Sequence, residues 1–366
     1  MNFLIFLILA VTPIYCMKGT NMYMNFPTMI PKPLIGENTS SSNCLSTLGT
    51  NTNLVGLKLN GTFPNSLSTS LIQMNLTTTI WEQLVNLTSF TSYPPLGSAF
   101  DDQTNVYFVA DVLANLFIVD TTNRTNIAEQ FINIQGLPLN GLNYVESSQS
   151  LIFLDIVATS PRRIGLLNLD IFNPSGLPNL LLTLKSEEDE RLLATLPSVV
   201  DNERGKLYFM TFVPKPFSST TTGSLSFSSI FLYTINIEQV LEPFLVSRTK
   251  LSDNIGYISM LAYDQVWDSL ITLGGVGALG TPTFMKINAT SGEMTPFSLI
   301  SPSLTTVEAT GYTYSSKCHA FIYAYFSASQ ENSLLVMVDL NENVTTVKEI
   351  QVSQEQGVFT GFYLQS

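Results

Sequence analysis

The sequence has one histidine, three cysteines and two tryptophans, and only 12% of its 366 residues are charged. Because His319 is the sole histidine, a Ser-His-Asp triad, a Cys-His dyad or a histidine-rich metal site must use this residue or be absent. Hydrophobic residues make up 45% of the chain, which excludes disorder for most of its length. The polar surface must come mainly from Ser, Thr and Asn, as is typical of an extracellular β-protein.

Basic residues are also scarce, and acidic residues outnumber them. Sixteen Lys and Arg residues stand against 28 Asp and Glu residues, so the formal net charge is −12. This charge would repel a phosphate backbone rather than neutralise it, which argues against nucleic acid as a partner. After the first residues no run of about 18 apolar residues occurs, so we expect no stable insertion into a membrane.

A short apolar run, FLIFLILAVTPI, occupies Phe3–Ile14. It is too short to span a bilayer and has the length of a signal-peptide core, so residues 1–18 are predicted to be a cleaved secretory signal. No Lys or Arg precedes the run, and a short membrane anchor is the alternative. Residues 19–43 lack a sustained apolar period and are expected to form an extended lead-in. We therefore expect a secreted, extracellular protein.

Two further features are consistent with secretion. Seven Asn-x-Ser/Thr sequons are candidate N-glycosylation sites: Asn38, Asn60, Asn75, Asn86, Asn123, Asn288 and Asn343. Cys16 lies in the predicted signal peptide, which leaves Cys44 and Cys318 to form one disulfide in an oxidising compartment. Two free, buried thiols are the alternative. The ring closure described below places the two cysteines on neighbouring blades, which favours the disulfide.

An apolar strand that ends in Asn or Asp recurs along the chain. Its copies are LIQMN at Leu71, LFIVD at Leu116, IGLLN at Ile164, FLYTIN at Phe231, FMKIN at Phe284 and LVMVD at Leu335. They are spaced by 45, 48, 67, 53 and 51 residues, close to the roughly 40–50 residues of a four-stranded propeller blade. The longest interval contains a Ser/Thr-rich insertion at 214–229, which we expect to lengthen one hairpin loop.

The strand that opens each unit also recurs. Its copies are GSAFD at Gly97, GLNYVE at Gly141, LPSVVD at Leu196, ISMLAYD at Ile258, TGYTY at Thr310 and TGFYL at Thr360. The last copy opens an unfinished unit, whereas the first unit, Leu54–Leu87, has three strands and no opening strand. Pairing of these two segments closes a ring and removes a free sheet edge.

The predicted fold is therefore all-β. It is a β-propeller over residues 44–366 with six four-stranded blades, closed by pairing of the C-terminal strand with the N-terminal blade. Five or seven blades are the alternatives, because a degenerate unit around residues 210–230 would change the count.

The repeat resembles the β-propellers of the NHL, YVTN and calcium-dependent lactonase-like superfamilies. The stretch that carries the resemblance best is NVYFVADVLANLFIVDTTN at Asn105–Asn123, and the similarity covers residues 54–366. It lies at the level of the repeat, and no site motif of any of these families accompanies it. The resemblance therefore implies the fold and says little about activity.

Several local motifs have a structural explanation. Gly275–Gly280 matches G-x-G-x-x-G, but a strand rather than a helix is predicted to follow, so we interpret it as a hairpin loop. Lys185–Arg191, KSEEDER, is expected to be a surface connection. His319 is predicted to be an exposed turn residue. The acidic residues that end the opening strands are predicted to cap turns: Asp101, Glu146, Asp201 and Asp264.

Polar residues also lie in the loops just before the opening strands, where several blades meet at the mouth of the central channel. They are Asn140, Asp253, Asn254, Glu308 and Glu355. Oxygen ligands that converge from several loops are what a hard cation such as calcium requires. In lactonase-like propellers a calcium ion at the channel activates an ester, so the resemblance implies calcium as the one possible cofactor.

The sequence favours a binding module over an enzyme. The single histidine and the scattered carboxylates offer no catalytic constellation, so the leading hypothesis is a secreted, glycosylated propeller that binds an extracellular protein, a glycan or a small molecule. The alternative is a calcium-dependent hydrolase of the lactonase or phosphodiester type, with the metal at the channel mouth. A structural glycoprotein of an extracellular matrix or coat is a third hypothesis.

Overall fold

The computed structural model describes most of the chain from residue 52 onward. The described ranges are 52–60, 68–78, 80–90, 97–111, 115–131, 140–159, 162–171, 178–186, 190, 198–214, 227–251, 255–276, 282–299, 309–327, 332–340, 345–350 and 358–365. All of them belong to one compact unit, Ser40–Ser366. Within these ranges the regular elements are strands and one short 3-10 helix, η2 (Glu146–Ser148). None of the described helices is long and apolar enough to cross a membrane.

The strands form six antiparallel sheets of four strands each, which we call blades 1 to 6. Within a blade the strands are named A to D from the centre of the ring outward. Blade 1 contains β24 (Val358–Gln365), β1 (Asn53–Asn60), β2 (Ser68–Asn75) and β3 (Trp81–Leu87). Blade 2 contains β4 (Gly97–Asp101), β5 (Val106–Ala110), β6 (Asn115–Asp120) and β7 (Thr125–Phe131). Blade 3 contains β8 (Asn140–Val145), β9 (Ser150–Thr159), β10 (Arg162–Asp170) and β11 (Asn179–Lys185).

The other three blades follow in the same order along the chain. Blade 4 contains β12 (Ser198–Asp201), β13 (Lys206–Pro214), β14 (Phe227–Asn236) and β15 (Phe244–Lys250). Blade 5 contains β16 (Ile255–Asp264), β17 (Ser269–Val276), β18 (Pro282–Ile287) and β19 (Met294–Leu299). Blade 6 contains β20 (Ala309–Ser315), β21 (Ala320–Ser327), β22 (Asn332–Leu340) and β23 (Thr345–Ile350).

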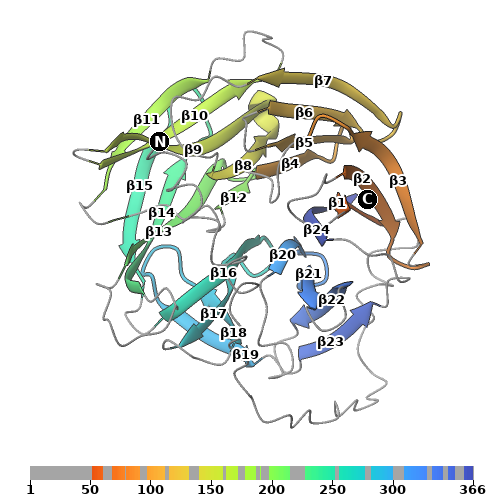
Figure 1. Ribbon diagram of the computed structural model, residues 1–366. Helices are drawn as coiled ribbons and strands as arrows, with labels where there is room; N and C mark the ends of the chain where they lie inside the picture. The colour runs from red at the N-terminus through yellow and green to blue at the C-terminus, as the bar shows by residue number, and fades with distance from the viewer. Residues whose placement is uncertain are drawn as a thin grey trace, which may run out of the picture. The chain divides into compact units, whose positions relative to one another are not determined.

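The six A strands contact one another in ring order, from β4 through β8, β12, β16 and β20 to β24 and back to β4. Figure 1 shows the blades arranged around this centre, with the D strands on the outside. The protein is therefore a six-bladed β-propeller, and the prediction of six blades is confirmed. The alternatives with five or seven blades are wrong.

The B and C strands are apolar on both faces because each lies between two neighbouring blades. In β5, Tyr107 and Val109 pack toward blade 1, whereas Phe108 and Ala110 pack toward blade 3. Side chains alternate across a strand, so a strand with neighbours on both sides needs an unbroken apolar run rather than alternation. The whole core follows this rule, because its six buried clusters each join two adjacent blades.

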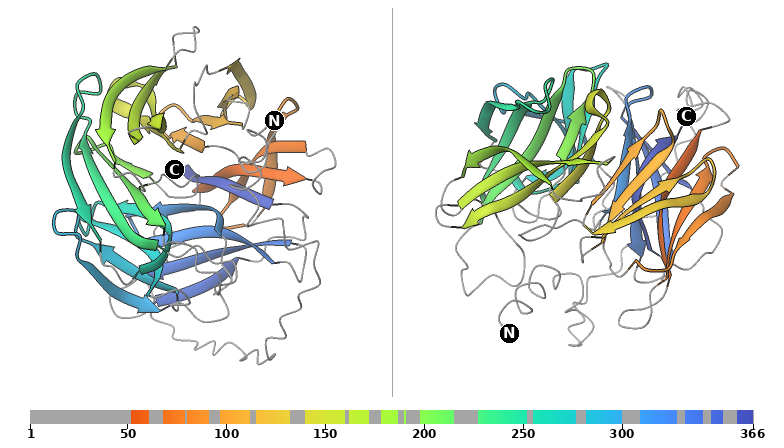
Figure 2. Two further views of the ribbon diagram at one scale, coloured as in Figure 1. Left: turned by 60° about the vertical axis from the view of Figure 1, so that its left-hand side comes forward. Right: turned by 90° about the horizontal axis from the view of Figure 1, so that it is seen from above.

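The ring is closed by the C-terminal strand, as predicted. β24 pairs antiparallel with β1, with Leu54 opposite Leu364, and it occupies the A position of blade 1. Figure 2 shows this blue strand beside the orange strands of blade 1 in both views. Gly361 has a left-handed φ of 62°, and a Cβ there would lie 2.5 Å from the Tyr107 hydroxyl. The Tyr107 hydroxyl instead donates to the Gly361 carbonyl at 2.6 Å, which ties blade 1 to blade 2.

The Asn or Asp at the end of the C strand, or directly after it, has a local function in four blades. Asn75, Asp120, Asn236 and Asn288 each accept a hydrogen bond on their side-chain oxygen from a main-chain N–H two or three residues further on. These side chains therefore start the turn into the D strand, which explains the repeat. In blade 3 the register places Asp170 at this position, opposite Ser150. The anchor IGLLN was therefore assigned two residues too early.

Candidate functional site at the A–B turns

The turns between the A and B strands share one backbone conformation. Each turn ends in a residue with left-handed φ: Asn105 (58°), Gln149 (48°), Gly205 (56°), Asp268 (50°) and His319 (50°). In three blades the carbonyl of this residue accepts a hydrogen bond, at 2.6–2.9 Å, from a main-chain N–H at the end of the C strand or directly after it. We call these five turns, together with the residue before each one, the rim: 101–105, 145–149, 201–205, 264–268 and 315–319.

Neighbouring turns of the rim are joined by side-chain contacts. From blade 2 to blade 4, Glu146 accepts hydrogen bonds from Gln103 at 3.1 Å and from Asn202 at 3.3 Å. From blade 4 to blade 5, Arg204 forms an ion pair with Asp268. The rim is thus one continuous polar surface rather than five separate turns.

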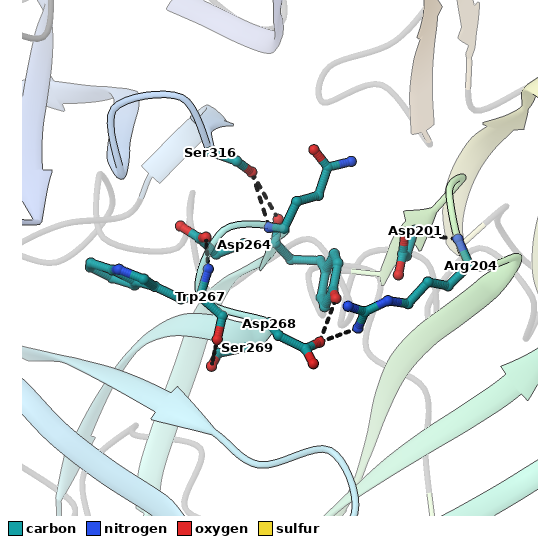
Figure 3. A network of polar contacts seen from close by, with 9 residues as sticks. Asp201, Arg204, Asp264, Trp267, Asp268, Ser269 and Ser316 are labelled. Atoms are coloured by element: carbon teal, nitrogen blue, oxygen red, sulfur yellow. Dashed lines mark hydrogen bonds and ion pairs between the residues drawn. The ribbon is translucent and has the colours of Figure 1, made fainter.

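The most buried pair of the rim joins blade 5 to blade 6. The Nδ1 atom of His319 lies 2.7 Å from Oδ2 of Asp264, whose side chain is fully buried, while the His319 side chain is 21% exposed. The Tyr314 hydroxyl donates to the same Oδ2, and the main-chain N–H of Trp267 donates to Oδ1 at 2.7 Å. Figure 3 shows the hydrogen bond between Asp264 and the main-chain N–H of Trp267. Both oxygens of Asp264 are therefore satisfied by donors.

The indole ring of Trp267 contacts the side chains of His319 and Lys286. Its ring stacks on His319 with centroids 4.0 Å apart and an interplanar angle of 7°. The Lys286 ammonium lies 3.8 Å from the centroid of the same indole. Because both faces of the ring are covered, Trp267 is not a free platform on which a sugar ring can stack.

Burial controls the protonation of the groups around this pair. Desolvation, followed by the hydrogen bond to Asp264, holds the pKa of Tyr314 far above its ordinary value of 10.0. Desolvation also raises the pKa of Asp339 above 3.8, and the charge of His319 opposes that change. Tyr314 therefore stays a hydrogen-bond donor at every physiological pH.

A second group lies between blades 4 and 5. The Tyr263 hydroxyl donates to Asp268 at 2.6 Å, and the Arg204 guanidinium lies 5.5 Å from the centroid of the Tyr263 ring. Tyr208 stacks on Tyr263 with centroids 5.8 Å apart. The oxygen Oδ1 of Asp201 accepts the main-chain N–H of Arg204 at 3.2 Å. Figure 3 shows that Arg204 reaches from the turn that starts at Asp201 toward Asp268.

The rim between blades 4 and 5 presents exposed charged and apolar side chains. Arg204 and Asp268 have side chains that are 43% and 63% exposed, and Val266 in the turn of blade 5 is 66% exposed. Aromatic residues and arginine are the types enriched where proteins bind one another. In the described part of the chain, no hydroxyl or thiol is hydrogen bonded to Nε2 of His319, as an activated nucleophile would be.

The residues predicted to surround the channel mouth lie mostly outside the described structure. Asp253, Asn254, Glu308 and Glu355 fall outside the described residues, and only the main chain of Asn140 is described, at the start of β8. No group of three or more His, Cys, Asp or Glu side chains that could hold a metal ion occurs among the residues that the structure describes. Calcium at the channel mouth therefore stays a prediction.

The other predicted sites are placed in part. Asn86, Asn123 and Asn288 are exposed and Asn75 is partly buried, while the side chains of Asn38, Asn60 and Asn343 are outside the described residues. Cys318 packs against the buried cluster that joins blade 6 to blade 1. This is the seam to which the topology assigned it, but Cys44 lies outside the described residues, and the disulfide stays a prediction.

Two interpretations of local motifs are corrected by the structure. His319 does lie in a turn, but it is largely covered by Trp267 and paired with Asp264, so it is not an exposed turn residue. Within Lys185–Arg191, Glu190 is fully buried. It accepts hydrogen bonds from Tyr233 at 2.7 Å and from Arg248 at 2.8 Å. This residue therefore anchors the connection between blades 3 and 4.

The prediction for the acidic residues that end the A strands is confirmed in three blades. Asp101, Asp201 and Asp264 each accept a main-chain N–H two or three residues further on, as a turn cap does. The side chain of Glu146 instead contacts the turns of both neighbouring blades. The contacts between turns could not be predicted because the two residues of each contact lie 43 to 64 residues apart in the sequence. Only an alignment of the five turns on their left-handed residue would have placed these residues at comparable positions.

Comparison with known proteins supports the fold alone. No protein-family model and no curated protein matches the sequence. The structure is similar to TolB from Acinetobacter baumannii, with a TM-score of 0.53, 10% identity, and coverage of 86% of this chain and 67% of that chain. It is also similar to a putative 6-phosphogluconolactonase from Bacteroides fragilis, with a TM-score of 0.49, 8% identity, and coverage of 87% and 99%. The likeness to TolB supports the β-propeller fold and does not narrow the resemblance to the NHL, YVTN or lactonase-like families.

Proposed function

We propose that this protein is a secreted, glycosylated β-propeller that acts as an extracellular interaction module and binds a protein partner through the rim of blades 4 to 6. The observation that carries the proposal is the combination, on one continuous surface, of exposed Arg204, Asp268 and Val266 with the half-buried rings of Tyr263 and Trp267. A few aromatic and arginine anchors, partly buried before binding, supply most of the affinity of typical interfaces.

Secretion is supported by the sequence. The apolar run Phe3–Ile14 has the length of a signal-peptide core. The exposure of Asn86, Asn123 and Asn288 would make these sequons accessible to glycosylation. We expect protein recovered from the medium of a eukaryotic secretory host to begin near residues 17–21 and to lose mass with an N-glycosidase. An intact leader and no change in mass would contradict this part of the proposal.

The binding surface is tested with one substitution on the rim and one away from it. Val266→Asp places a charge at the centre of the proposed interface, whereas Ile127→Asp does the same on β7, where the side chain is 57% exposed. The labelled, secreted full chain is titrated onto the surface of the cells that produce it and onto their matrix. We expect saturable binding that Val266→Asp abolishes and Ile127→Asp retains. Equal loss with both variants, or no saturable binding, would refute the role of the rim.

A further inference from the structure

Asp201 differs from the other acidic residues of the rim in one hydrogen bond. The residue is 2% exposed, and its Oδ1 accepts the Arg204 main-chain N–H. Its Oδ2 is buried and, among the described residues, has no hydrogen-bond donor. An unpaired buried carboxylate oxygen is costly, so it requires an explanation.

The equivalent acids in other blades have donors for both oxygens. In blade 2, Asp101 accepts the main-chain N–H groups of Gln103 and Thr104 on Oδ1 and the Thr104 hydroxyl on Oδ2. In blade 5, Asp264 accepts Trp267 on Oδ1 and both Tyr314 and His319 on Oδ2. In blades 2 and 5, therefore, the second oxygen of the equivalent acid accepts a hydrogen bond, whereas Oδ2 of Asp201 has no donor among the described residues.

The tyrosine whose position would allow it to donate to Asp201 is Tyr263, and it donates to another residue. Tyr314 and Tyr263 occupy matching positions, each one residue before the last residue of its A strand. Tyr314 donates across the seam to Asp264 of the preceding blade. Tyr263 donates instead to Asp268 of its own turn, at 2.6 Å, which leaves Oδ2 of Asp201 unpaired.

We propose that the seam between blades 4 and 5 binds a basic side chain, the ammonium of a lysine or the guanidinium of an arginine, of the protein partner. This proposal rests on the proposed function and names the chemistry of its partner. Asp201 and Asp268 would supply the negative charge, and the stacked rings of Tyr208 and Tyr263 would supply a face for the cation. The net charge of −12 would attract a basic partner from a distance.

Arg204 shows how such a cation fits. Its guanidinium lies 5.5 Å from the Tyr263 ring and pairs with Asp268, so it occupies part of the proposed site from within the chain. Both side chains of this ion pair are about half exposed, and exposed ion pairs contribute little to stability. A cation from the partner can therefore displace the Arg204 guanidinium, whose charge already acts on the carboxylate of Asp201. Burial raises the pKa of Asp201 above 3.8, and a bound cation would oppose that change.

The test is a titration of the purified full chain with hexalysine at low ionic strength, with hexaglutamate as the control peptide. Asp201→Asn keeps the turn cap through its amide oxygen but removes the charge, and we expect it to weaken binding at least tenfold, as should Asp268→Asn. Asp102→Asn is the matched control, because this exposed acid lies in the turn of blade 2 and its loss changes the net charge equally. Arg204→Gln should tighten binding severalfold, because it removes the internal competitor.

Each outcome of the titration decides the question. If hexalysine binding weakens by the same factor in all three acid variants, the peptide is attracted by the net charge of the protein, and the proposed cation site is wrong. Absence of hexalysine binding, or weaker binding with Arg204→Gln, would overturn it as well. Val266→Asp separates this proposal from the proposed function: if that variant abolishes partner binding while Asp201→Asn leaves it unchanged, the rim is the interface and the cation site is wrong.

Discussion

Replacing Asp155 by asparagine should stabilise the protein above pH 6. Asp155 lies in β9, between blades 2 and 3, and is 4% exposed. Among the described residues the main-chain N–H of Ile156 is the one donor to its carboxylate, at 2.6 Å. Burial without a cation raises the pKa of Asp155 from 3.8 to about 6, so the fold favours the neutral acid.

The size of the effect follows from this difference in pKa. A rise from 3.8 to about 6 corresponds to about 3 kcal/mol at about 1.4 kcal/mol for each tenfold change in proton affinity. Because the folded pKa lies above the unfolded one, the free energy of unfolding falls as the pH rises from about 4 to about 6 and is lowest above that range. Asparagine carries no charge and keeps an acceptor for Ile156, so we expect a gain of about 1–3 kcal/mol at pH 7.5.

Urea unfolding between pH 4 and pH 8 measures this gain. The matched control is Asp111→Asn, because Asp111 directly follows β5 and, like Asp155, lies six residues after the left-handed residue of its turn. Both oxygens of Asp111 accept hydrogen bonds from Asn115, at 2.9 and 3.0 Å, so this variant should lose stability. If Asp155→Asn destabilises the protein at pH 7.5, or keeps the pH dependence of the parent, the interpretation of Asp155 is wrong.

Four further predictions concern stability and metal content. His319→Ala should lower the free energy of unfolding by about 2–3 kcal/mol in urea melts, because it removes the hydrogen bond with Asp264 and places alanine at left-handed φ. Asparagine tolerates that φ, so His319→Asn should cost about 1 kcal/mol less, and equal losses would contradict this reasoning. Glu190→Gln should cost about 3 kcal/mol, since it leaves a partly buried guanidinium without its carboxylate, and a neutral result would contradict the importance of this pair. Cys44 and Cys318 should appear as one cross-linked peptide in non-reducing mapping, with a stabilisation of up to about 5 kcal/mol for a loop of roughly 270 residues; two free thiols would exclude the disulfide. Purified protein should contain no stoichiometric calcium by mass spectrometry, whereas one tightly held ion per chain would support the hydrolase.

The fold could be predicted because its repeat has local physical causes. Asn75 and Asp120 recur at the ends of C strands since each starts a turn with its own side chain, and that requirement is visible in the sequence. The closure by β24 was predictable from an unfinished unit and an incomplete first one. The anchor of blade 3 was misplaced because Asn168 and Asp170 are both polar and lie two residues apart, so that only the register separates them.

The rim could not be predicted in the same way. Its pairs depend on which turns become neighbours, and Asp264 and His319 are 55 residues apart in the sequence. The sequence indicated only that each residue lies near a turn. Glu190 was misjudged for a related reason, because its acidic neighbours suggested a solvated run while Tyr233 and Arg248 lie more than 40 residues away.

The position of β24 also determines when the protein can become a complete ring during its synthesis. β3 ends at Leu87 and β24 begins at Val358, so the 270 residues 88–357 separate the end of β3 from the strand that completes the N-terminal blade. At translation rates of about 5–20 residues per second, the ribosome needs roughly 15–50 s to cover that distance. Throughout this interval β1 has an unpaired edge, which is a template for pairing with other chains. A chaperone that shields strand edges should therefore raise the yield of this protein, and it should act on the nascent chain before β24 emerges.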